Sequence, residues 1–530
     1  MNKLAPALLA CALLAGHAQA QPVASPAAPP ARTAAGGPAG VAQANTRATR
    51  QYYAGLIAGP TPRIAELTLF MTLLPKGGDL HHHYSGAIYA ETYLDWLRQA
   101  GYCVYRADTE GGKRRFTIET RPKAELPDTA RPLCLSSDEI LDARNNDFYR
   151  ELLMRWSDKD YDNHSQLQPP PDQQFFSTFG YFGPISVYDY NQGLRHLKAR
   201  AVAENVQYIE TMLRSAPATD LAGGSEAGKR VNALATDADV ATVEAALVPL
   251  YEALAADGAT QSAIGDYLKV LEQAAAGIDD ADFKLRFQAY VSRNSAPAQV
   301  FAGLYAACAA AARPGGKLVG VNIVGPENMH VAMRDYRLHM RMFAYLKQKF
   351  PAVRLALHAG ELALGMVPPE GLQSHIRDAV EIAGAQRIGH GVDIAHERDA
   401  AGLLRMMRER DIPVEVNLTS NAFILGVLGE THPLPLYRRH GVPMVISTDD
   451  PGVSRNNLTG EYVLYASRYQ PGYEELKRTV LDSIRYSFLA PEEKTAELKS
   501  LTQRFAVFEA RIQAIARDMG RPLPSRRPAR

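Results

Sequence analysis

The sequence predicts an α/β fold of the (β/α)8 TIM-barrel type, with a helical insertion after the first strand and helices towards the C-terminus. Three observations support this prediction. Short apolar or alternating runs recur eight times, longer helix-patterned segments separate most of them, and polar side chains suited to chemistry follow several of the runs. In such barrels the chemistry lies at the carboxyl ends of the strands. A chain of 530 residues with 46% hydrophobic residues can bury a core of that size.

The N-terminal segment has the pattern of an export signal. Lys3 precedes a mostly apolar stretch, and the Ala-Gln-Ala triplet at 18–20 fits a cleavage site, so residues 1–20 are predicted to be a secretory signal peptide. We therefore expect an exported protein, periplasmic or secreted. Cys11, at the end of a Leu-Leu-Ala-Cys run, leaves a lipoprotein anchor as a minor alternative.

Composition divides the rest of the chain. Residues 21–48 are rich in Ala, Pro and Gly and are predicted to be a flexible linker, residues 49–520 form the barrel, and residues 521–530 form a basic tail. No later stretch is long and apolar enough to predict a membrane span. Lys plus Arg (58) nearly balance Asp plus Glu (57), which argues against nucleic acid as a partner and favours a small ligand of little charge.

The eight predicted strands justify the barrel in chain order. They are Gly78 to His83, Val206 to Met212, Phe283 to Tyr290, Leu318 to Val324, Arg354 to His358, Arg387 to His390, Val414 to Leu418 and Met444 to Thr448. The segment from Tyr84 to Glu204 is too long for an ordinary connection and is predicted to add helices over the mouth of the barrel. Within it, Cys103 and Cys134 could form a bridge in an oxidising compartment. Residues 473–519 have the pattern of terminal helices.

The first and fifth of these strands end in histidines. In Asp79-Leu-His81-His82-His83, alternate residues of an extended segment share a face, so His81 and His83 can point at one ion. An apolar run also ends in His358, and Glu361 follows three residues later. A metal-binding imidazole followed by a carboxylate is suited to metal-assisted hydrolysis, because the ion activates water and the carboxylate moves a proton. A surface cluster of histidines and a core histidine are the alternatives.

Two further strand ends carry the same kinds of group. His390 lies between glycines at the end of the sixth strand, where a structural histidine is the alternative interpretation, and the adjacent acids Asp449 and Asp450 follow the apolar eighth strand. Paired carboxylates at such a position are costly unless a cation compensates them. Four such motifs in one chain predict a mononuclear metal hydrolase, with zinc as the ion that suits these ligands.

The same stretches carry a family resemblance. Pro75-Lys-Gly-Gly-Asp-Leu-His-His-His, His358-Ala-Gly-Glu361, Arg387-Ile-Gly-His390-Gly and Ser447-Thr-Asp-Asp-Pro451, in this order, resemble the adenosine deaminase family over about residues 73–455. Asp482-Ser-Ile-Arg-Tyr-Ser-Phe-Leu is similar to the secreted, growth-factor-related branch. That branch carries a disulfide shortly after the first histidine motif, which Cys103 and Cys134 would supply.

The resemblance implies a metal site in the barrel. One Zn²⁺ ion per chain would be held by His81, His83, His358 and Asp449 together with a water molecule.

The resemblance also implies the residues that act on the substrate. Glu361 would be the proton shuttle to the purine ring, and His390 would orient and stabilise the hydroxide. The backbone of Gly325 would contact the six-membered ring, and Asp450 would hydrogen-bond a nitrogen of the five-membered ring. The implied reaction is hydrolytic deamination of adenosine or 2′-deoxyadenosine to inosine and ammonia, with a purine nucleoside as the small-molecule partner and the oligomeric state open.

One position departs from the family pattern. Tyr84-Ser85-Gly86 stands where the family has an acid that contacts the sugar. Two other functions therefore stay open: hydrolysis of another aminopurine or amino-heterocycle, and an exported binding or signalling protein without turnover. Cytidine-type zinc deaminases are excluded because the chain lacks their Pro-Cys-x-x-Cys ligand pattern.

Overall fold

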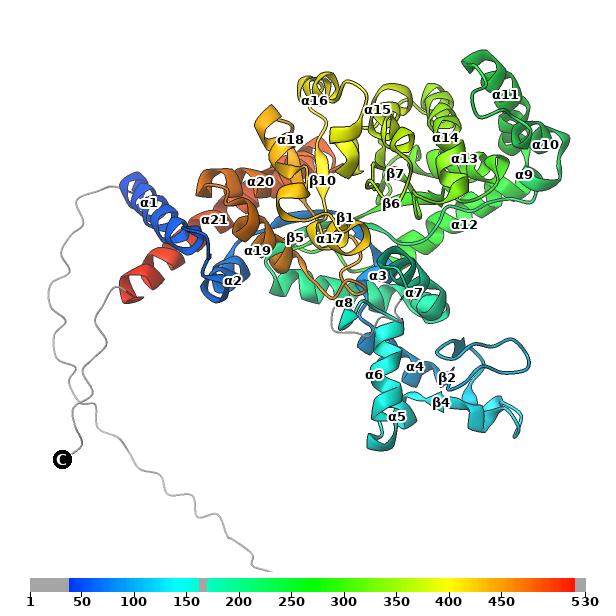
Figure 1. Cartoon of the computed structure of the whole chain (residues 1–530), viewed down its shortest axis with the longest axis horizontal. Helices are drawn as coiled ribbons and strands as arrows, with labels where there is room; N and C mark the ends of the chain where they lie inside the picture. The colour runs from blue at the N-terminus through cyan, green and yellow to red at the C-terminus, as the bar shows by residue number, and fades with distance from the viewer. Residues whose placement is uncertain (1–37, 162–168, 520–530) are drawn as a thin grey trace, which may run out of the picture.

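The computed structural model describes residues 38–161 and 169–519 (Figure 1). The predicted signal peptide, the first part of the predicted linker and the basic tail lie outside the described residues. No helix in the described part of the chain combines the length and the apolar character that a membrane crossing needs.

Eight parallel strands form two four-stranded sheets in chain order. The first sheet contains β1 (Gly77–His83), β5 (Val206–Met212), β6 (Lys284–Ser292) and β7 (Leu318–Val324). The second contains β8 (Ala356–Ala359), β9 (Arg387–His390), β10 (Val414–Val416) and β11 (Met444–Ile446). Single bridges join Val321 to Leu355 and His82 to Asp449, at the two seams between the sheets. The result is an α/β fold with parallel sheets of the TIM-barrel family.

The predicted strands match the observed ones to within two residues at each end, and two of the differences, near the C-terminal end, have a visible cause. The seventh strand was expected to reach Leu418 but ends at Val416, because helix α17 (Leu418–Leu425) begins there. The eighth was expected to reach Thr448 but ends at Ile446. Thr448 instead turns its backbone N–H and its hydroxyl to the carboxylate of Asp79, which lies in β1.

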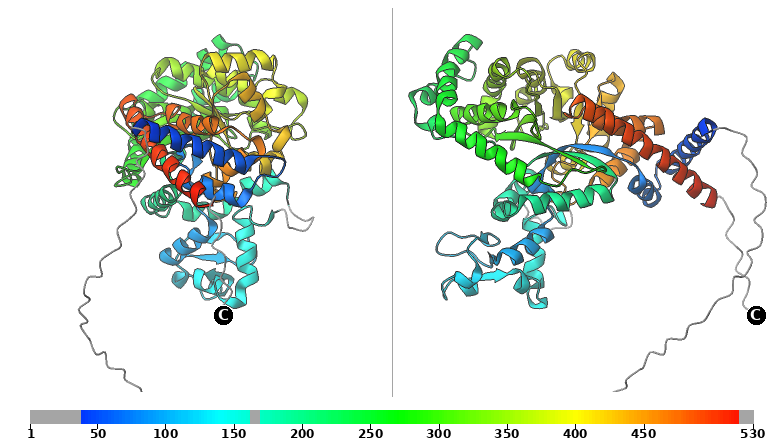
Figure 2. Two further views of the ribbon diagram at one scale, coloured as in Figure 1. Left: turned by 90° about the vertical axis from the view of Figure 1, so that its left-hand side faces the viewer. Right: turned by 180° about the vertical axis from the view of Figure 1, so that it is seen from behind.

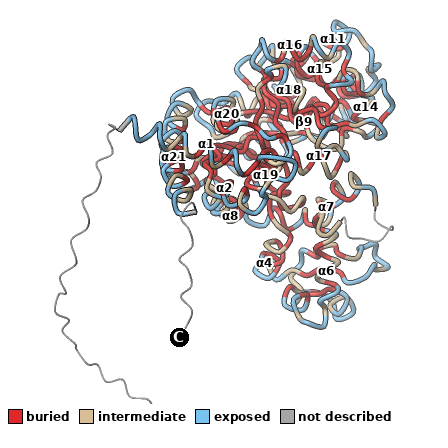
Figure 3. The backbone as a smooth tube through the Cα atoms, turned by 60° about the vertical axis from the view of Figure 1, so that its left-hand side comes forward, coloured by how far each residue is buried: buried red, intermediate tan, exposed pale blue. Residues whose placement is uncertain are grey.

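Helices cover the outer face of the sheets, and Figure 3 shows that the buried residues gather between the strands and these helices. The covering helices include α8 (Tyr190–Ala203), α13 (Pro297–Ala311), α14 (His330–Lys349), α16 (Ala400–Glu409), α18 (Leu434–His440), α19 (Leu458–Tyr469) and α20 (Tyr473–Arg485). Between β5 and β6 the chain adds α9 (Leu221–Gly224), α10 (Glu226–Asn232), α11 (Val240–Ala256) and α12 (Gly258–Ala274). Cys308 in α13 is a buried free thiol.

The insertion after β1 is not purely helical, which corrects the prediction. It contains a three-stranded antiparallel sheet of β2 (Cys103–Tyr105), β3 (Ile118–Glu119) and β4 (Cys134–Ser136), flanked by α4 (Ala90–Ala100), α5 (Ser137–Ile140) and α6 (Asn146–Arg155). The predicted Cys103–Cys134 disulfide is confirmed and ties β2 to β4. Figures 1 and 2 show this unit projecting away from the barrel. The next helix, α7 (Pro171–Ser186), is the part of the insertion that returns to the barrel.

The N-terminal and C-terminal helices lie side by side (Figures 1 and 2). Helix α1 (Pro38–Ile57) begins inside the segment predicted to be a linker, and it packs on α21 (Pro491–Met519) and α2 (Ile64–Leu73). The Thr46 hydroxyl donates to Glu509 Oε2 at 2.6 Å, and the Tyr53 ring stacks on Phe70 at 5.2 Å. These tertiary contacts stabilise a helix that composition alone did not indicate.

Candidate metal centre and active site

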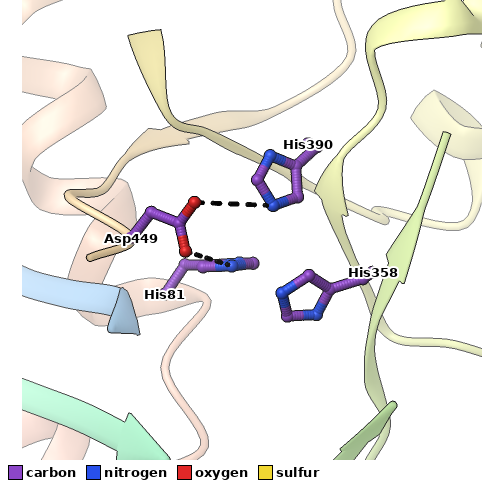
Figure 4. A group of neighbouring side chains, drawn as sticks. All are labelled: His81, His358, His390 and Asp449. Carbon is purple, nitrogen blue, oxygen red and sulfur yellow. Dashed lines mark ion pairs between the residues drawn. The ribbon is translucent and has the colours of Figure 1, made fainter. Parts of the chain in front are cut away.

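The strand ends bring the predicted metal-binding side chains together. His81 and His83 stand at the end of β1, His358 lies near the end of β8, His390 ends β9, and Asp449 follows β11. Strand alternation places His81 and His83 on the inner face, as predicted. Figure 4 shows His81, His358 and His390 arranged around the Asp449 carboxylate.

Backbone hydrogen bonds hold the Asp449 segment against β1. Asp449 N donates to His81 O at 2.9 Å, and His83 N donates to Asp449 O at 3.1 Å. Asp449 and His390 have φ values of +62° and +67°, in the left-handed region that residues other than glycine seldom occupy. Such strain persists only where the surrounding structure enforces it, and it is typical of functional sites.

The side-chain atoms lie within the reach of one ion. His81 Nε2 is 3.5 Å and His83 Nε2 is 3.3 Å from Asp449 Oδ1, and the ring centres of His81 and His358 are 4.4 Å apart. Ligand atoms of His81, His358, His390 and Asp449 all lie within 4.8 Å of one another. His390, predicted to act on the hydroxide, thus belongs to this group, whereas the predicted ligand His83 forms a second group with Asp449 and Asp450.

Two of the histidines are oriented to present a bare nitrogen to this centre. His81 Nδ1 lies 2.7 Å from Glu415 Oε2, and His358 Nδ1 lies 2.9 Å from Asn322 Oδ1. Asn322 Oδ1 also accepts from two backbone N–H groups, so it is an acceptor, and both imidazoles must carry their proton on Nδ1. Their Nε2 lone pairs then face the cluster, as in metal-binding histidines whose other nitrogen donates to an oxygen.

The chemistry of this donor set fits a zinc ion. His81 Nε2 and His390 Nε2 are buried and have no hydrogen-bond partner among the described residues. Burial and the neighbouring imidazoles keep the pKa of His358 well below its usual value, so the ring is neutral and able to ligate. Despite its burial, the pKa of Asp449 stays below its usual value because His81, His390 and His83 surround it. Neutral imidazoles around one carboxylate are ligands that Zn²⁺ prefers.

A buried ion-pair network behind His81 was not predicted. Glu415 in β10 accepts from Arg387 Nε at 2.5 Å as well as from His81, and Arg387 Nη2 lies 2.6 Å from Glu210 Oε2 in β5. All four side chains are buried. The sequence did hold a signal, because a charged residue inside an apolar strand such as Val-Glu-Val requires a partner.

A second buried network positions Glu361. Glu327 accepts from Gly360 N at 3.1 Å, from Glu361 N at 3.0 Å and from His375 Nδ1 at 2.5 Å, and it pairs with Arg293 Nη1 at 3.2 Å. Burial opposes the charge of Glu327, but Arg293, His375 and these donors lower its pKa to about 2. The fixed carboxylate therefore anchors the backbone that carries Glu361.

Glu361 lies beside His390 at this centre. Its Oε1 lies 3.7 Å from His390 Nε2. Burial, together with the negative charges of Asp449 and Glu327, raises the pKa of Glu361 well above its usual value. A carboxyl group that stays protonated near neutral pH can give its proton to a bound substrate.

A pocket of about 170 Å³ opens on these residues. Its walls are His83, Ser85, Phe175, Phe176, Phe179, Met212, Tyr290, Val324, Gly325, His358, Glu361, His390, Asp449 and Asp450. The two predicted substrate-binding residues, Gly325 and Asp450, and the Phe175 to Phe179 segment of α7 thus lie at the pocket. None of these described lining residues is a lysine or an arginine.

The space that the Asp450 side chain occupies explains the glycine at position 86. An added Cβ at Gly86 would lie 1.6 Å from Asp450 Oδ1, so only glycine leaves room for this carboxyl group. Burial and the adjacent Asp449 raise the pKa of Asp450 well above its usual value, and Asp450 Oδ1 has no hydrogen-bond partner in the described part of the chain. Asp450 can therefore offer the pocket a hydrogen bond.

Comparison with known proteins places this geometry in a family. A family model described as adenosine deaminase matches residues 233–504, which include His358, Glu361, His390 and Asp449. The chain belongs to the adenosine deaminase family. The matched residues include β6 to β11, whereas His81 and His83 of β1 lie outside them.

The similar proteins cover different shares of the chain. An adenosine deaminase from Clostridium perfringens is 33% identical over 142 residues, and one from Escherichia coli is 34% identical over 143. Each match spans 27% of this chain and 40% of the relative. An N6-methyl-AMP deaminase structure from Arabidopsis thaliana has a TM-score of 0.50 and 17% identity, covering 84% of this chain and 98% of that one. This last likeness shows a shared fold.

Proposed function

We propose that the protein is a zinc-dependent hydrolase that deaminates adenosine or 2′-deoxyadenosine to inosine and ammonia. The observation that carries this proposal is the cluster of His81, His358, His390 and Asp449 at the strand ends of an adenosine deaminase family fold. His83 Nε2 lies 3.3 Å from Asp449 Oδ1, and Glu361 lies beside His390. We also infer that the two sheets close into a (β/α)8 barrel, since single bridges join them at both seams.

The metal would be held by His81, His83, His358 and Asp449. Zinc bound there supplies a Lewis acid that lowers the pKa of water towards about 7. His81 and His358 present Nε2 lone pairs towards it, and Asp449 supplies negative charge.

The chain's own groups would act on the purine. Glu361, protonated because burial and neighbouring acids raise its pKa, would donate to a ring nitrogen and make the amino-bearing carbon electrophilic. His390 would hydrogen-bond the attacking water from its place beside Glu361. Protonated Asp450 and the Gly325 backbone, both at the pocket wall, would fix the ring.

The pocket favours an uncharged substrate over a nucleotide. Its phenylalanines suit a planar ring, and the described residues that line it include carboxyl groups but no cationic side chain that would balance a phosphate. Ser85 stands at this wall in place of a sugar-contacting acid. A free base such as adenine, or another amino-heterocycle of this size, is therefore the second candidate substrate.

An ammonia-release assay on purified protein tests the proposal. The panel is adenosine, 2′-deoxyadenosine, adenine, adenosine 5′-monophosphate and guanine, with elemental analysis for zinc in parallel. We expect turnover of a nucleoside and little of the monophosphate. Faster turnover of adenine would select the second candidate. If zinc is bound but no compound of the panel releases ammonia, a binding or signalling protein is favoured. Ammonia release by protein that contains no transition metal would refute the mechanism.

We propose further that the protein works outside the cytoplasm. The pattern of residues 1–20 and the Cys103–Cys134 bridge support this, because stable disulfides form in oxidising compartments. Fractionation of expressing cells with mass analysis of the mature N-terminus tests it, and an unprocessed cytoplasmic chain with reduced thiols would refute it.

A further inference from the structure

A line of buried polar groups runs from a backbone amide to His390. Leu434 N, at the start of α18, donates to His432 Nδ1 at 3.1 Å. His432 Nε2 lies 3.1 Å from Asn421 Oδ1, and Asn421 Nδ2 lies 3.0 Å from His390 Nδ1. The side chains of His432, Asn421 and His390 are all buried, at 3%, 0% and 1% exposure. The line reaches the catalytic pocket from its outer side.

The direction of these hydrogen bonds is fixed at the far end. A backbone N–H can only donate, so His432 Nδ1 must accept, and this buried ring carries its single proton on Nε2. That proton goes to Asn421 Oδ1, which turns the Asn421 amide nitrogen towards His390. His390 Nδ1 therefore accepts, with Asn417 Nδ2 as a second donor at 3.4 Å. The His390 proton must then lie on Nε2.

This state is the opposite of that of the neighbouring imidazoles. His81 and His358 carry their proton on Nδ1 and turn a bare Nε2 to the cluster. His390 turns an N–H group to it, 3.7 Å from Glu361 Oε1 and 3.9 Å from Asp449 Oδ2. A protonated nitrogen cannot ligate a metal ion. Proximity alone, which counts His390 with the possible ligands, does not make this distinction.

We propose that Asn421 and His432 are positioning residues that hold His390 in the Nε2–H tautomer, as a hydrogen-bond donor and not a metal ligand. The tautomer follows from the buried line alone, whereas its effect on turnover rests on the proposed function. The donor would face the water that attacks the substrate, between the two carboxyl groups. In other enzymes a catalytic histidine held in the wrong tautomer loses several orders of magnitude in rate.

The test changes one atom of the line. In Asn421→Asp a carboxylate faces His390 Nδ1, can only accept, and draws the proton onto Nδ1. We expect kcat to fall at least about 100-fold, with little change in KM and an unchanged zinc content. Asn146→Asp makes the same change at an exposed position of α6 and is the matched control.

A second pair of variants guards against a simple loss of folding. His432→Gln can accept from Leu434 N and still donate to Asn421, so we expect it to keep most of its activity, whereas His432→Phe breaks the line. Equal losses in both variants would indicate a packing role and overturn the proposal.

The direct readout is the ¹⁵N NMR spectrum of the imidazoles in the zinc-loaded full chain. We expect a protonated Nε2 and a bare Nδ1 for His390, and the reverse in Asn421→Asp. A protonated Nδ1 in the unaltered protein would overturn the proposal, as would full kcat in Asn421→Asp. If the unaltered protein deaminates nothing, the proposed function fails, while the NMR measurement still decides the tautomer.

Discussion

Glu327 offers a strong test of how this site is held. Its two carboxylate oxygens receive three N–H groups, from Gly360, Glu361 and His375, and Arg293 pairs with the same carboxylate. In Glu327→Gln one oxygen becomes an NH2 group, which is itself a donor. At least one of the three N–H groups then faces another donor, and the Arg293 charge loses its partner.

The size of the effect follows from these contacts. A hydrogen bond to a charged group contributes about 1.5–3 kcal/mol, and removing one partner of a buried ion pair costs about 3–5 kcal/mol. The two losses share one group and are not additive. We therefore expect the free energy of unfolding to fall by about 3–5 kcal/mol. Because the Glu361 amide loses its anchor, we expect kcat to fall about 10- to 100-fold, with zinc retained.

Chemical denaturation and steady-state kinetics measure the two effects. Glu370→Gln is the matched control, because Glu370 is exposed in the short 3-10 helix Pro369–Leu372 and its substitution should change neither quantity. If Glu327→Gln unfolds at the same denaturant concentration as the unaltered protein and keeps its kcat, the buried carboxylate neither stabilises the fold nor positions the proton donor.

Four further substitutions test separate parts of the structure. Glu361→Gln keeps the shape of the side chain but cannot deliver a proton, so turnover should fall about 10²–10⁴-fold with zinc retained. Asp449→Asn should lower zinc occupancy as well as turnover. The reverse pattern would show that the two roles are exchanged. Cys103→Ser removes the disulfide that closes a 31-residue loop to Cys134, and we expect the free energy of unfolding to fall by about 3–4 kcal/mol. If limited proteolysis of this variant begins in the inserted unit, the loss is confined to that unit. Burial raises the pKa of Glu461 to about 7 in the fold against 4.5 unfolded, so the stability it contributes is full below pH 4.5 and is lost as the pH rises through 7. Between these two pH values the free energy of unfolding should change by about 3 kcal/mol less in Glu461→Gln than in the unaltered protein, as denaturation curves would show. An identical change in both proteins would refute the assignment of this pH dependence to Glu461.

The strands and the polar side chains at their ends could be predicted from the sequence for a physical reason. Strands of a parallel sheet are covered on both faces, so they read as apolar runs, and a glycine or a polar residue marks where each run ends. The bounds of β5, β7 and β9 match the predicted ranges for this reason. Once the strand ends are known, the barrel arrangement itself brings their polar side chains together.

Other features depend on partners that are distant in sequence. Helix α1 has a weakly apolar face, and its stability comes from α21, more than 400 residues away. Strands β2 to β4 are two or three residues long, too short for a period of two to be visible, and the disulfide holds them together. The Cys103–Cys134 bridge could be predicted from the sequence. No pattern within either segment indicates the short strands or the contact with α21, so these became visible only in the folded chain.

The line that orients His390 was equally hidden. Asn421 lies in a short helix and His432 in a loop, and neither position has a motif that indicates a link to β9. The family resemblance suggested a role for His390, but only the direction of hydrogen bonds from Leu434 onwards decides which of its nitrogens carries the proton.

Two buried arginines, Arg293 and Arg387, connect the two sheets near the site. Between β7 and β8 the backbone offers a single bridge, from Val321 to Leu355. Arg293 Nη2 donates both to Ile323 O in β7, at 3.2 Å, and to His358 O in β8, at 2.8 Å. Its side chain thus replaces ladder hydrogen bonds at the point where a proposed zinc ligand is carried.

Arg387 also connects the two sheets, since it lies in the second sheet and pairs with a glutamate of the first. A buried ion pair adds little net stability compared with apolar packing, but its geometry fixes the position of each strand end relative to the other. Precise placement of ligands from both sheets is what the metal centre requires.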